Sequence, residues 1–346
     1  MLSGLPSVAA GIVFLVSAAA SLAASWLLVS RLEALAGRAG LSEGMLGLVA
    51  ALAADAPEIT AAVSALAHHQ THVGAGVTLG SNVFNLAALL GLGAAVAGWI
   101  GLHRKVIVLG GVVALWVAAV SLVVVTGLVS PLAGIVVVAV VFVPYVVVLA
   151  AEGWPDRLVL RPPAGMAGWL ATAVAQEEAE LEPALVDPAL HLRPRGWRTD
   201  AAVAAAALSA VVLASTVMEL TATTLGDRLA VPGIVTGAIV LAAVTSLPNA
   251  VAAVYLANRG RGAAVLSTAL NSNALNVIAG FLIPAAIIGL GPPSSTTTLV
   301  TAWYAGLTAA VLAAAYRASG LRRGTGVAVI VAYLIFVGWL LAAAYR

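Results

Sequence analysis

The 346-residue chain contains no cysteine, and charged residues make up only 9% of it. The absence of cysteine excludes disulfides, thiolate metal sites, iron–sulfur clusters and cysteine nucleophiles. Soluble domains carry roughly 25% charged residues, whereas 62% of this chain is hydrophobic. A soluble globule could not bury so much apolar surface, so the composition predicts an integral membrane protein that lies in lipid.

Two other features are missing. The net charge of +2 is small and scattered along the chain, which argues against a nucleic-acid partner. The phosphate-binding pattern G-x-x-x-x-G-K-[ST] does not occur, so we expect no nucleotide partner and no cofactor.

Ten stretches are long and apolar enough to cross a bilayer, which takes roughly 20 residues each. Lipid admits only helices or closed barrels, and these runs lack the two-residue alternation of barrel strands, so we predict helices. No basic residue precedes the first stretch, so we expect it to be retained as a span and not cleaved as a signal peptide. The predicted spans are residues 8–29, 44–67, 73–100, 106–127, 130–151, 200–222, 231–257, 263–289, 297–316 and 325–345.

One long polar segment, residues 152–199, divides the spans into five and five. The predicted organisation is a first five-helix repeat at 1–151, a cytoplasmic linker at 152–199 and a second five-helix repeat at 200–346. The acidic run from Glu177 to Glu182 within the linker reads as a solvated helix face, with a regulatory Ca²⁺ site as the alternative.

The basic residues orient the chain, because they concentrate on the cytoplasmic side of membrane proteins. With the N-terminus outside, 14 of the 16 lysines and arginines fall on the cytoplasmic side, and only Arg228 and Arg346 do not. Since each half has five spans, the second half enters the membrane from the opposite side, and the two halves are inverted. Arginine far outnumbers lysine and alanine is abundant, which is typical of a GC-rich prokaryotic genome, so we expect the plasma membrane of a prokaryote.

The two halves also repeat each other in sequence. A shift of 191 residues superimposes four pairs without a gap: Pro57 and Pro248, Ser81 and Ser272, Asn82 and Asn273, Asn85 and Asn276. These pairs lie within residues 44–100 and 231–289. Inverted repeats with proline-interrupted helices are typical of secondary transporters, whose ion site lies where the repeats meet.

Away from the span ends, only three acidic residues lie in the predicted spans, namely Asp55, Glu58 and Glu219; Asp200 is the first residue of the sixth span. Asp55 and Glu58 share a helix face, and Pro57 between them leaves backbone carbonyls without their helical partner. Carboxylate, carbonyl, hydroxyl and amide oxygens suit Na⁺ or Ca²⁺ and not soft metals. Hydrogen bonding between helices is the alternative role for these polar groups. The candidate ligands are Asp55, Glu58, Ser81, Asn85, Thr245, Ser246, Asn249, Ser272 and Asn276.

The remaining polar residues in or near the spans have simpler interpretations. For Glu219 we favour a helix-to-helix hydrogen bond or an extension toward the membrane surface over a functional role. His68, His69 and His72 are expected in a polar turn outside the membrane, with a metal site or a pH sensor as the alternative.

The segments ADAPE at 54–58 and GSNVFN at 80–85, together with TSLPN at 245–249 and NSNALN at 271–276, resemble paired motifs of the calcium/cation antiporter superfamily. This superfamily includes the sodium/calcium exchangers, and the resemblance covers both repeats and the ten-span plan. It implies an antiporter that exchanges Ca²⁺ or another small cation for Na⁺ or H⁺ by alternating access. It also implies that the first and sixth helices slide as the site changes sides.

The sequence departs from the family pattern at the acids. Asn249 replaces a glutamate, Asn276 replaces a frequent aspartate, and Ala54-Asp55 replaces Thr-Ser. Both acids therefore come from one helix, so Na⁺/H⁺ exchange on the same fold is an alternative, and a passive cation channel is a more distant one. An enzyme is not expected, because all five histidines lie at or outside the ends of the spans.

The orientation can be tested in this cysteine-free chain with introduced thiols. A cysteine at Glu180 should resist a membrane-impermeant thiol reagent added to intact cells and react after permeabilisation, because the linker is cytoplasmic. Leu128→Cys, in the predicted outer loop between the fourth and fifth spans, is the control and should react in intact cells. Labelling of residue 180 from outside would overturn the assignment.

Overall fold

The computed structural model describes residues 5–41, 43–150, 168–170, 172–173 and 196–345. Most of the predicted linker, including the acidic run from Glu177 to Glu182, lies outside the described residues. Within them the chain is almost entirely helical, as the sequence predicts.

Eight continuous helical runs are long and apolar enough to cross a membrane, and two bent helix pairs raise the number to ten when each pair is counted as one span. The ten predicted spans and the all-helical class are thereby confirmed. The first half consists of α1 (Ser7–Arg38), α2 (Glu43–Ala54), α3 (Ala56–Ala67), α4 (Thr71–Asn85), the π-helix η2 (Leu86–Leu92), α5 (Gly93–Ala97), α6 (Arg104–Val125) and α7 (Pro131–Ala150). The second half consists of α9 (Trp197–Arg228), α10 (Gly233–Val235), the π-helix η4 (Thr236–Leu241), α11 (Ala242–Asn258), α12 (Gly262–Leu275), the π-helix η5 (Asn276–Leu282), α13 (Ile283–Ile288), α14 (Ser295–Ala318) and α15 (Arg323–Ala344).

Helices α1 and α9 are longer than their predicted spans. The prediction ended the first span before Arg31, but this side chain is only 2% exposed and donates to Asp200 of α9 at 3.0 Å. Arg38 reaches the other oxygen of Asp200 at 2.8 Å. Burying Arg31 and Asp200 would be costly if they were unpaired, and the ion pair offsets this cost. Helices α1 and α9 can therefore extend beyond the apolar spans that the sequence predicts.

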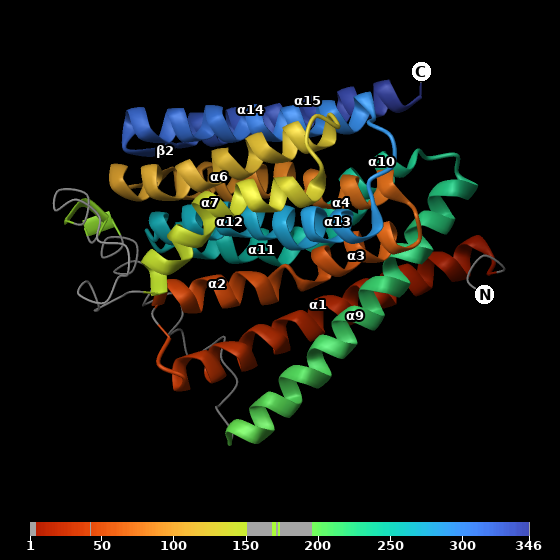
Figure 1. Ribbon diagram of the computed structural model, residues 1–346, viewed down its shortest axis with the longest axis horizontal. Helices are drawn as coiled ribbons and strands as arrows, with labels where there is room; N and C mark the ends of the chain where they lie inside the picture. Colours follow the sequence, from red (N-terminus) through yellow and green to blue (C-terminus); the bar gives the residue numbers. More distant parts are fainter. Residues whose placement is uncertain (1–4, 42, 151–167, 171, 174–195, 346) are drawn as a thin grey trace.

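The third predicted span also ends differently. Its last residues leave the helix and form the short strand β1 (Trp99–Gly101), which pairs antiparallel with β2 (Gly320–Arg322). Each strand has only three residues, which is too short a run to predict a strand from the sequence. Figure 1 shows β2 at one end of the helix bundle and both chain termini at the other. We call these the ribbon end and the terminus end.

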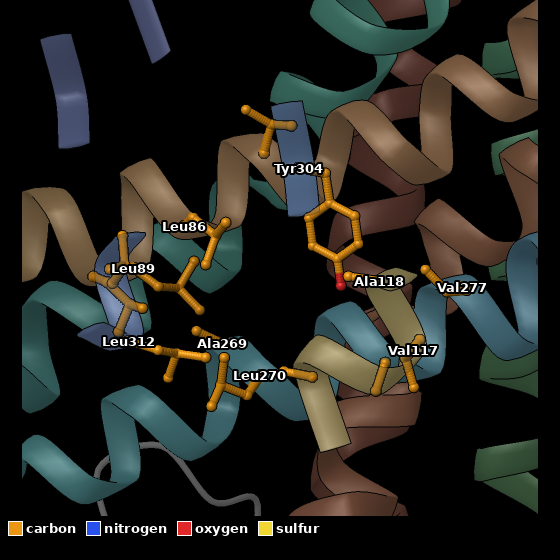
Figure 2. Packing of buried hydrophobic residues seen from close by; sticks show 14 of the residues in the cluster. Leu86, Leu89, Val117, Ala118, Ala269, Leu270, Val277, Tyr304 and Leu312 are labelled. Carbon is orange, nitrogen blue, oxygen red and sulfur yellow. The ribbon is translucent and has the colours of Figure 1, made fainter. Parts of the chain in front are cut away.

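The bundle has two parts. Helices α1 and α9 pack along each other at the lower side of Figure 1, where the hydroxyls of Ser21 and Ser215 meet at 2.7 Å. The other spans form the main core, in which Figure 2 shows the ring of Tyr304 from α14 pointing toward Ala118 of α6. The α1–α9 pair touches this core chiefly along α2 and α3.

Glycine lets two central spans approach at backbone distance. A Cβ atom added to Gly80 of α4 would lie 2.3 Å from the Cα atom of Ala238 in η4. A Cβ atom on Gly237 would likewise lie 2.3 Å from the carbonyl oxygen of Val73. Small residues spaced for close backbone contact are a common way to join helices in membranes. This contact fixes α4 against the seventh span, and α4 carries Ser81 and Asn82 one and two residues further on.

Substituting Gly80→Ala should therefore destabilise the bundle, because the added methyl group meets backbone and not a flexible side chain. Overpacking of this kind costs about 1–3 kcal/mol, so the thermal midpoint in detergent should fall by several degrees. Gly306→Ala in α14 is the matched control, since nothing lies within 4 Å of its added Cβ atom. Equal midpoints for the two variants would contradict the close contact.

Candidate functional site

Two broken helices meet at the centre of the bundle. The second span bends by 53° between α2 and α3, and the seventh bends by 56° where Leu247 precedes Pro248. Pro57 lies in the first turn of α3, where the missing N–H is tolerated, and Asp55 is the N-cap residue of that helix. Glu58 lies in the same first turn. Both carboxylates therefore lie at the N-terminus of α3, the end of a helix that favours negative charge.

Asp55 is fully buried and hydrogen-bonded to the second repeat. Its Oδ1 atom accepts from the amide of Asn249 at 3.0 Å and from the hydroxyl of Ser272 at 2.8 Å. The Oδ2 atom has no hydrogen-bond partner among the described residues. One oxygen of Asp55 thus holds the two repeats together, while the other remains available.

Glu58 is 2% exposed and also bonds to the second repeat. The hydroxyl of Ser246 donates to its Oε1 atom, and the amide of Asn276 donates to Oε2. Asn85, from the helix after α3, donates to Ser272 and to the side-chain oxygen of Asn273, each at 3.2 Å. The broken helices and the helices that follow them therefore form one polar cluster.

The hydrogen bonds of the cluster follow the symmetry of the two repeats. Asn82 donates to the carbonyl of Asn273 at 3.0 Å, and Asn273 donates to the carbonyl of Asn82 at 3.1 Å, across a sequence separation of 191 residues. This is the shift that superimposes the two halves. The bond from Asn249 to Asp55 and the bond from Ser246 to Glu58 are likewise images of each other under that shift. Reciprocal bonds of this kind place a local two-fold axis between Asn82 and Asn273.

Several buried oxygen atoms in and beside the cluster have no hydrogen-bond partner among the described residues. Besides Asp55 Oδ2, they are Thr78 Oγ1, Ser81 Oγ, Asn85 Oδ1 and Asn276 Oδ1. Buried polar atoms without partners are rare in folded proteins and call for an explanation. All of these atoms carry lone pairs of hard oxygen, which is the ligand type of Na⁺ and Ca²⁺.

The two carboxylates of the cluster, Asp55 and Glu58, have no basic partner among the described residues. Within the same residues, no group of three or more histidine, aspartate and glutamate side chains could hold a metal. The site therefore offers two carboxylates and otherwise neutral oxygens.

Seven of the nine candidate ligands take part in these hydrogen bonds, and Ser81 contributes a buried hydroxyl on the neighbouring helix α4. Thr245 differs, because its hydroxyl donates to the carbonyls of Leu241 and Ala242 in its own helix. Asn82 and Asn273 match under the repeat but are not among the nine candidate ligands, and the structure adds both to the cluster. Their signal was the same as that of Asn85 and Asn276, namely an amide at matched positions of both repeats.

Ser25 of α1 is a member that the sequence analysis missed. Its hydroxyl donates to the carbonyl oxygens of Ala53 at 3.0 Å and Ala54 at 3.3 Å. The carbonyl of Ala53 is the one left without a helical partner by Pro57, four residues later. The first span thus occupies the backbone oxygens that the break in the second span sets free.

π-Helical segments mark both repeats next to the cluster. One begins directly after Asn85 and another begins at Asn276. Such segments are frequent at functional sites because they shift the direction of a side chain relative to the α-helix around it. Here they adjoin the two asparagines that the repeat pairs.

The family of the chain follows from a comparison with known proteins. The sodium/calcium exchanger protein family matches residues 9–151 and 200–342, which include both broken helices. The chain belongs to the sodium/calcium exchanger family. This exchanger is a cation antiporter of two inverted repeats and not an enzyme. No curated protein matches its sequence.

Solved structures show the same fold. The H⁺/Ca²⁺ exchanger CAX superimposes with a TM-score of 0.70 at 13% identity, over 97% of this exchanger and 86% of CAX. The sodium-calcium exchanger NCX_Mj, soaked with 100 mM Na⁺ and 10 mM Sr²⁺, gives 0.60 at 20% identity, over 96% and 99% of the two chains. NCX_Mj soaked without Na⁺ and Ca²⁺ gives 0.59 at 18% identity, over 97% and 100%.

The other polar residues of the exchanger lie outside the central cluster. Glu219 is buried in α9 and accepts a hydrogen bond from Ser64 of α3, which is the interhelical contact that the sequence suggested. His68, His69 and His72 are exposed around the turn from α3 to α4. No group of three or more metal-ligating side chains occurs among the described residues.

The cluster can be tested by neutralising one acid of the exchanger. Glu58→Gln keeps the shape of the side chain but removes a ligand charge, and interactions with charged groups are worth about 1.5–3 kcal/mol. Cation affinity, measured by titration calorimetry, should fall by about tenfold or more, and exchange should be lost. Glu33→Gln in α1 is the control for loss of an acid elsewhere and should keep exchange. Full activity of Glu58→Gln in a folded protein would refute the site.

Proposed function

We propose that this antiporter exchanges Ca²⁺, or another small cation of similar chemistry, for Na⁺ or H⁺ at Asp55 and Glu58. The observation that carries the proposal is the pair of buried carboxylates without a basic partner in the described residues. A buried charge is costly unless it is paired or neutralised. Each state that crosses the membrane therefore needs a cation or protons at this site.

The neutral ligands support a hard cation. The two carboxylates and the unpartnered oxygens of Ser81, Asn85 and Asn276 approach the six to eight oxygens that Ca²⁺ takes. Asn249 and Asn276 now donate from their amide nitrogens to the carboxylates. Rotation of each amide would present its oxygen to an arriving cation, so the same residues can stabilise the empty and the loaded site.

The charge of the site limits which ions can be exchanged. Two carboxylates are neutralised by one Ca²⁺, by two Na⁺ or by two protons. CAX is described as an H⁺/Ca²⁺ exchanger and NCX_Mj as a sodium-calcium exchanger, and both have this fold. Na⁺/H⁺ exchange is the second candidate, because it needs only the same two acids.

Movement of α1 and α9 accounts for access to the site from alternate sides. These helices pack against each other and are joined by Ser21, Ser215 and the Arg31–Asp200 pair, whereas α1 contacts the break in the second span through Ser25. Sliding of the pair would remove the Ser25 hydroxyl from the carbonyls of Ala53 and Ala54. Those oxygens would then be free to contact the cation.

The proposed setting is the plasma membrane of a prokaryote with the terminus end outside and residues 152–199 in the cytoplasm. Both chain ends lie at the end of the bundle opposite β2 (Figure 1). At the ribbon end, Arg322 is the last residue of β2 and Arg104 begins the helix that follows β1. This arrangement agrees with the rule that basic residues concentrate in the cytoplasm. The proposed units remain the repeats at 1–151 and 200–346.

The ion pair can be identified with ⁴⁵Ca²⁺ and ²²Na⁺ in proteoliposomes. Uptake of ⁴⁵Ca²⁺ should follow an imposed gradient of Na⁺ or of pH, and internal Ca²⁺ should accelerate it, because a carrier exchanges its cargo. A passive channel would show no such counterflow. Uptake of ²²Na⁺ that responds to pH but not to Ca²⁺ would favour the Na⁺/H⁺ alternative.

Exchange should also be nearly independent of membrane voltage, because the site carries the same net charge with one Ca²⁺ bound as with two Na⁺ or two protons bound. Uptake would be compared at zero and about −100 mV, set by potassium and valinomycin, where moving one charge is worth roughly 2.3 kcal/mol. Asn249→Glu restores the family acid and should strengthen divalent binding while making transport voltage-dependent. Strong voltage dependence of the unmutated protein would contradict the two-charge site.

A further inference from the structure

Glu219 is buried within the spanning helix α9, and it belongs neither to the exchange site nor to the ion pairs of Asp200. It lies in α9 with no measurable exposure. No basic side chain forms an ion pair with it in the described residues. An ionisable side chain at such depth is a candidate functional group, because its burial is costly.

The immediate ligands of Glu219 are hydroxyls. Ser64 of α3 donates to its Oε2 atom at 2.8 Å, and Thr223, one turn later in α9, lies 3.1 Å from Oε1. The three side chains offer oxygen atoms around a single negative charge. One charge and few ligands do not suit Ca²⁺, which takes six to eight oxygens. They suit a monovalent cation, either Na⁺ or a proton.

The site adjoins solvent at the terminus end. A hollow of about 290 Å³ lies there between the turn before α4, the end of α9 and the start of the seventh span. Thr223 both lines this hollow and contacts Glu219. A cation in the hollow is therefore one side chain away from the carboxylate.

The charged and titratable groups around the hollow come from three elements. His69 and His72 line it from the turn before α4 and from α4 itself, and Asp227 lines it from α9. His68, at the end of α3, contacts the carbonyl of Ser64 at 2.8 Å through Nδ1. Arg228 turns toward Ser7 at 3.3 Å. The neighbouring parts of α1 and η4, residues 7–30 and 236–241, contain no titratable side chain.

An apolar layer separates Glu219 from the central cluster. Ser64 follows Glu58 by six residues in α3, which places it about 9 Å further along the helix axis. Between these levels Ala61, Ala62 and Met218 pack with Leu241 in one buried group. Glu219 therefore lies apart from the central cluster, on the side toward the terminus end, and is not a ligand of the central cation.

We propose that Glu219, Ser64 and Thr223 form a second cation site, which receives the monovalent ion from the terminus end before it enters the central site. The proposal rests on the proposed exchange for Na⁺ or H⁺. It assigns to Glu219 the loading of that ion from one side of the membrane, whereas Asp55 and Glu58 carry all transported cations.

The test compares two kinds of flux in oriented membrane vesicles that contain the full chain. One is Ca²⁺ efflux driven by Na⁺ or H⁺, and the other is ⁴⁵Ca²⁺/Ca²⁺ counterflow, which needs no monovalent ion. Glu219→Gln should raise the half-saturating concentration of the monovalent ion at the terminus end by about tenfold or more, because a charged ligand is lost. The ratio of driven efflux to counterflow should fall accordingly. Separate Na⁺ and pH jumps show which ion is loaded.

Thr223→Val is the second variant, because it removes the link to the hollow and keeps the acid. It should shift the same half-saturating concentration in the same direction. Thr224→Val is its matched control. Each hydroxyl donates to the carbonyl four residues before it, Thr223 to that of Glu219 and Thr224 to that of Leu220, but Thr223 also reaches the Glu219 carboxylate. An equal change in the half-saturating concentration of the ion supplied at the ribbon end would contradict a site that loads from one side only.

The alternative is a purely structural hydrogen bond between α9 and α3. In Glu219→Gln the new side chain can still accept the hydrogen bond from Ser64. A purely structural role therefore predicts that Glu219→Gln and Thr223→Val have the same ratio of driven efflux to counterflow as Thr224→Val. This result would overturn the proposal. Absence of Ca²⁺ counterflow in the unmutated protein would refute the proposed function instead. In that case, the number of ²²Na⁺ ions or protons bound by purified protein, with and without Glu219→Gln, still decides whether the second site exists.

Discussion

The arrangement of the central site depends on two buried carboxylates that form no ion pair in the part of the chain that the structure describes. In lipid this charge must be balanced by something that enters and leaves, because among the described residues no ion pair is made with either acid. The N-terminus of α3 stabilises both acids, and the amides and hydroxyls of the second repeat hold them in place. The same requirement explains why so many neighbouring oxygens are left without a hydrogen bond.

The breaks in the second and seventh spans bring side chains of both repeats to the two carboxylates. The proline in each broken helix removes a backbone bond and turns the chain, so that side chains from the second and seventh spans meet. Asn82 and Asn273 join the helices that follow through two equivalent bonds. The glycine contact between α4 and η4 then holds these spans at backbone distance. Position, charge and symmetry are thus set by few residues, each with a separate physical role.

Sequence patterns predicted most of this fold, because lipid imposes long apolar runs and the repeat leaves polar matches inside them. The spans, the inverted halves and a cluster around Asp55 and Glu58 follow from that logic. Three features do not. The buried pair of Arg31 with Asp200 joins residues far apart in sequence, so neither helix reveals the compensation alone. The three-residue strands depend on pairing between distant loops. The contact of Ser25 with Ala53 depends on how α1 crosses the second span.

The unequal distribution of acids has a consequence for the resting state. In a transporter with two identical inverted halves, rotation about the two-fold axis turns the outward-facing form into the inward-facing form, so the two have equal free energy. Here the shift that superimposes the repeats places Ser246 on Asp55 and Asn249 on Glu58. Both negative charges therefore lie on the second span, so the two-fold rotation no longer converts one access form into the other, and their free energies are unequal. The placement of both acids in one repeat is therefore one reason for the two access forms to differ in free energy.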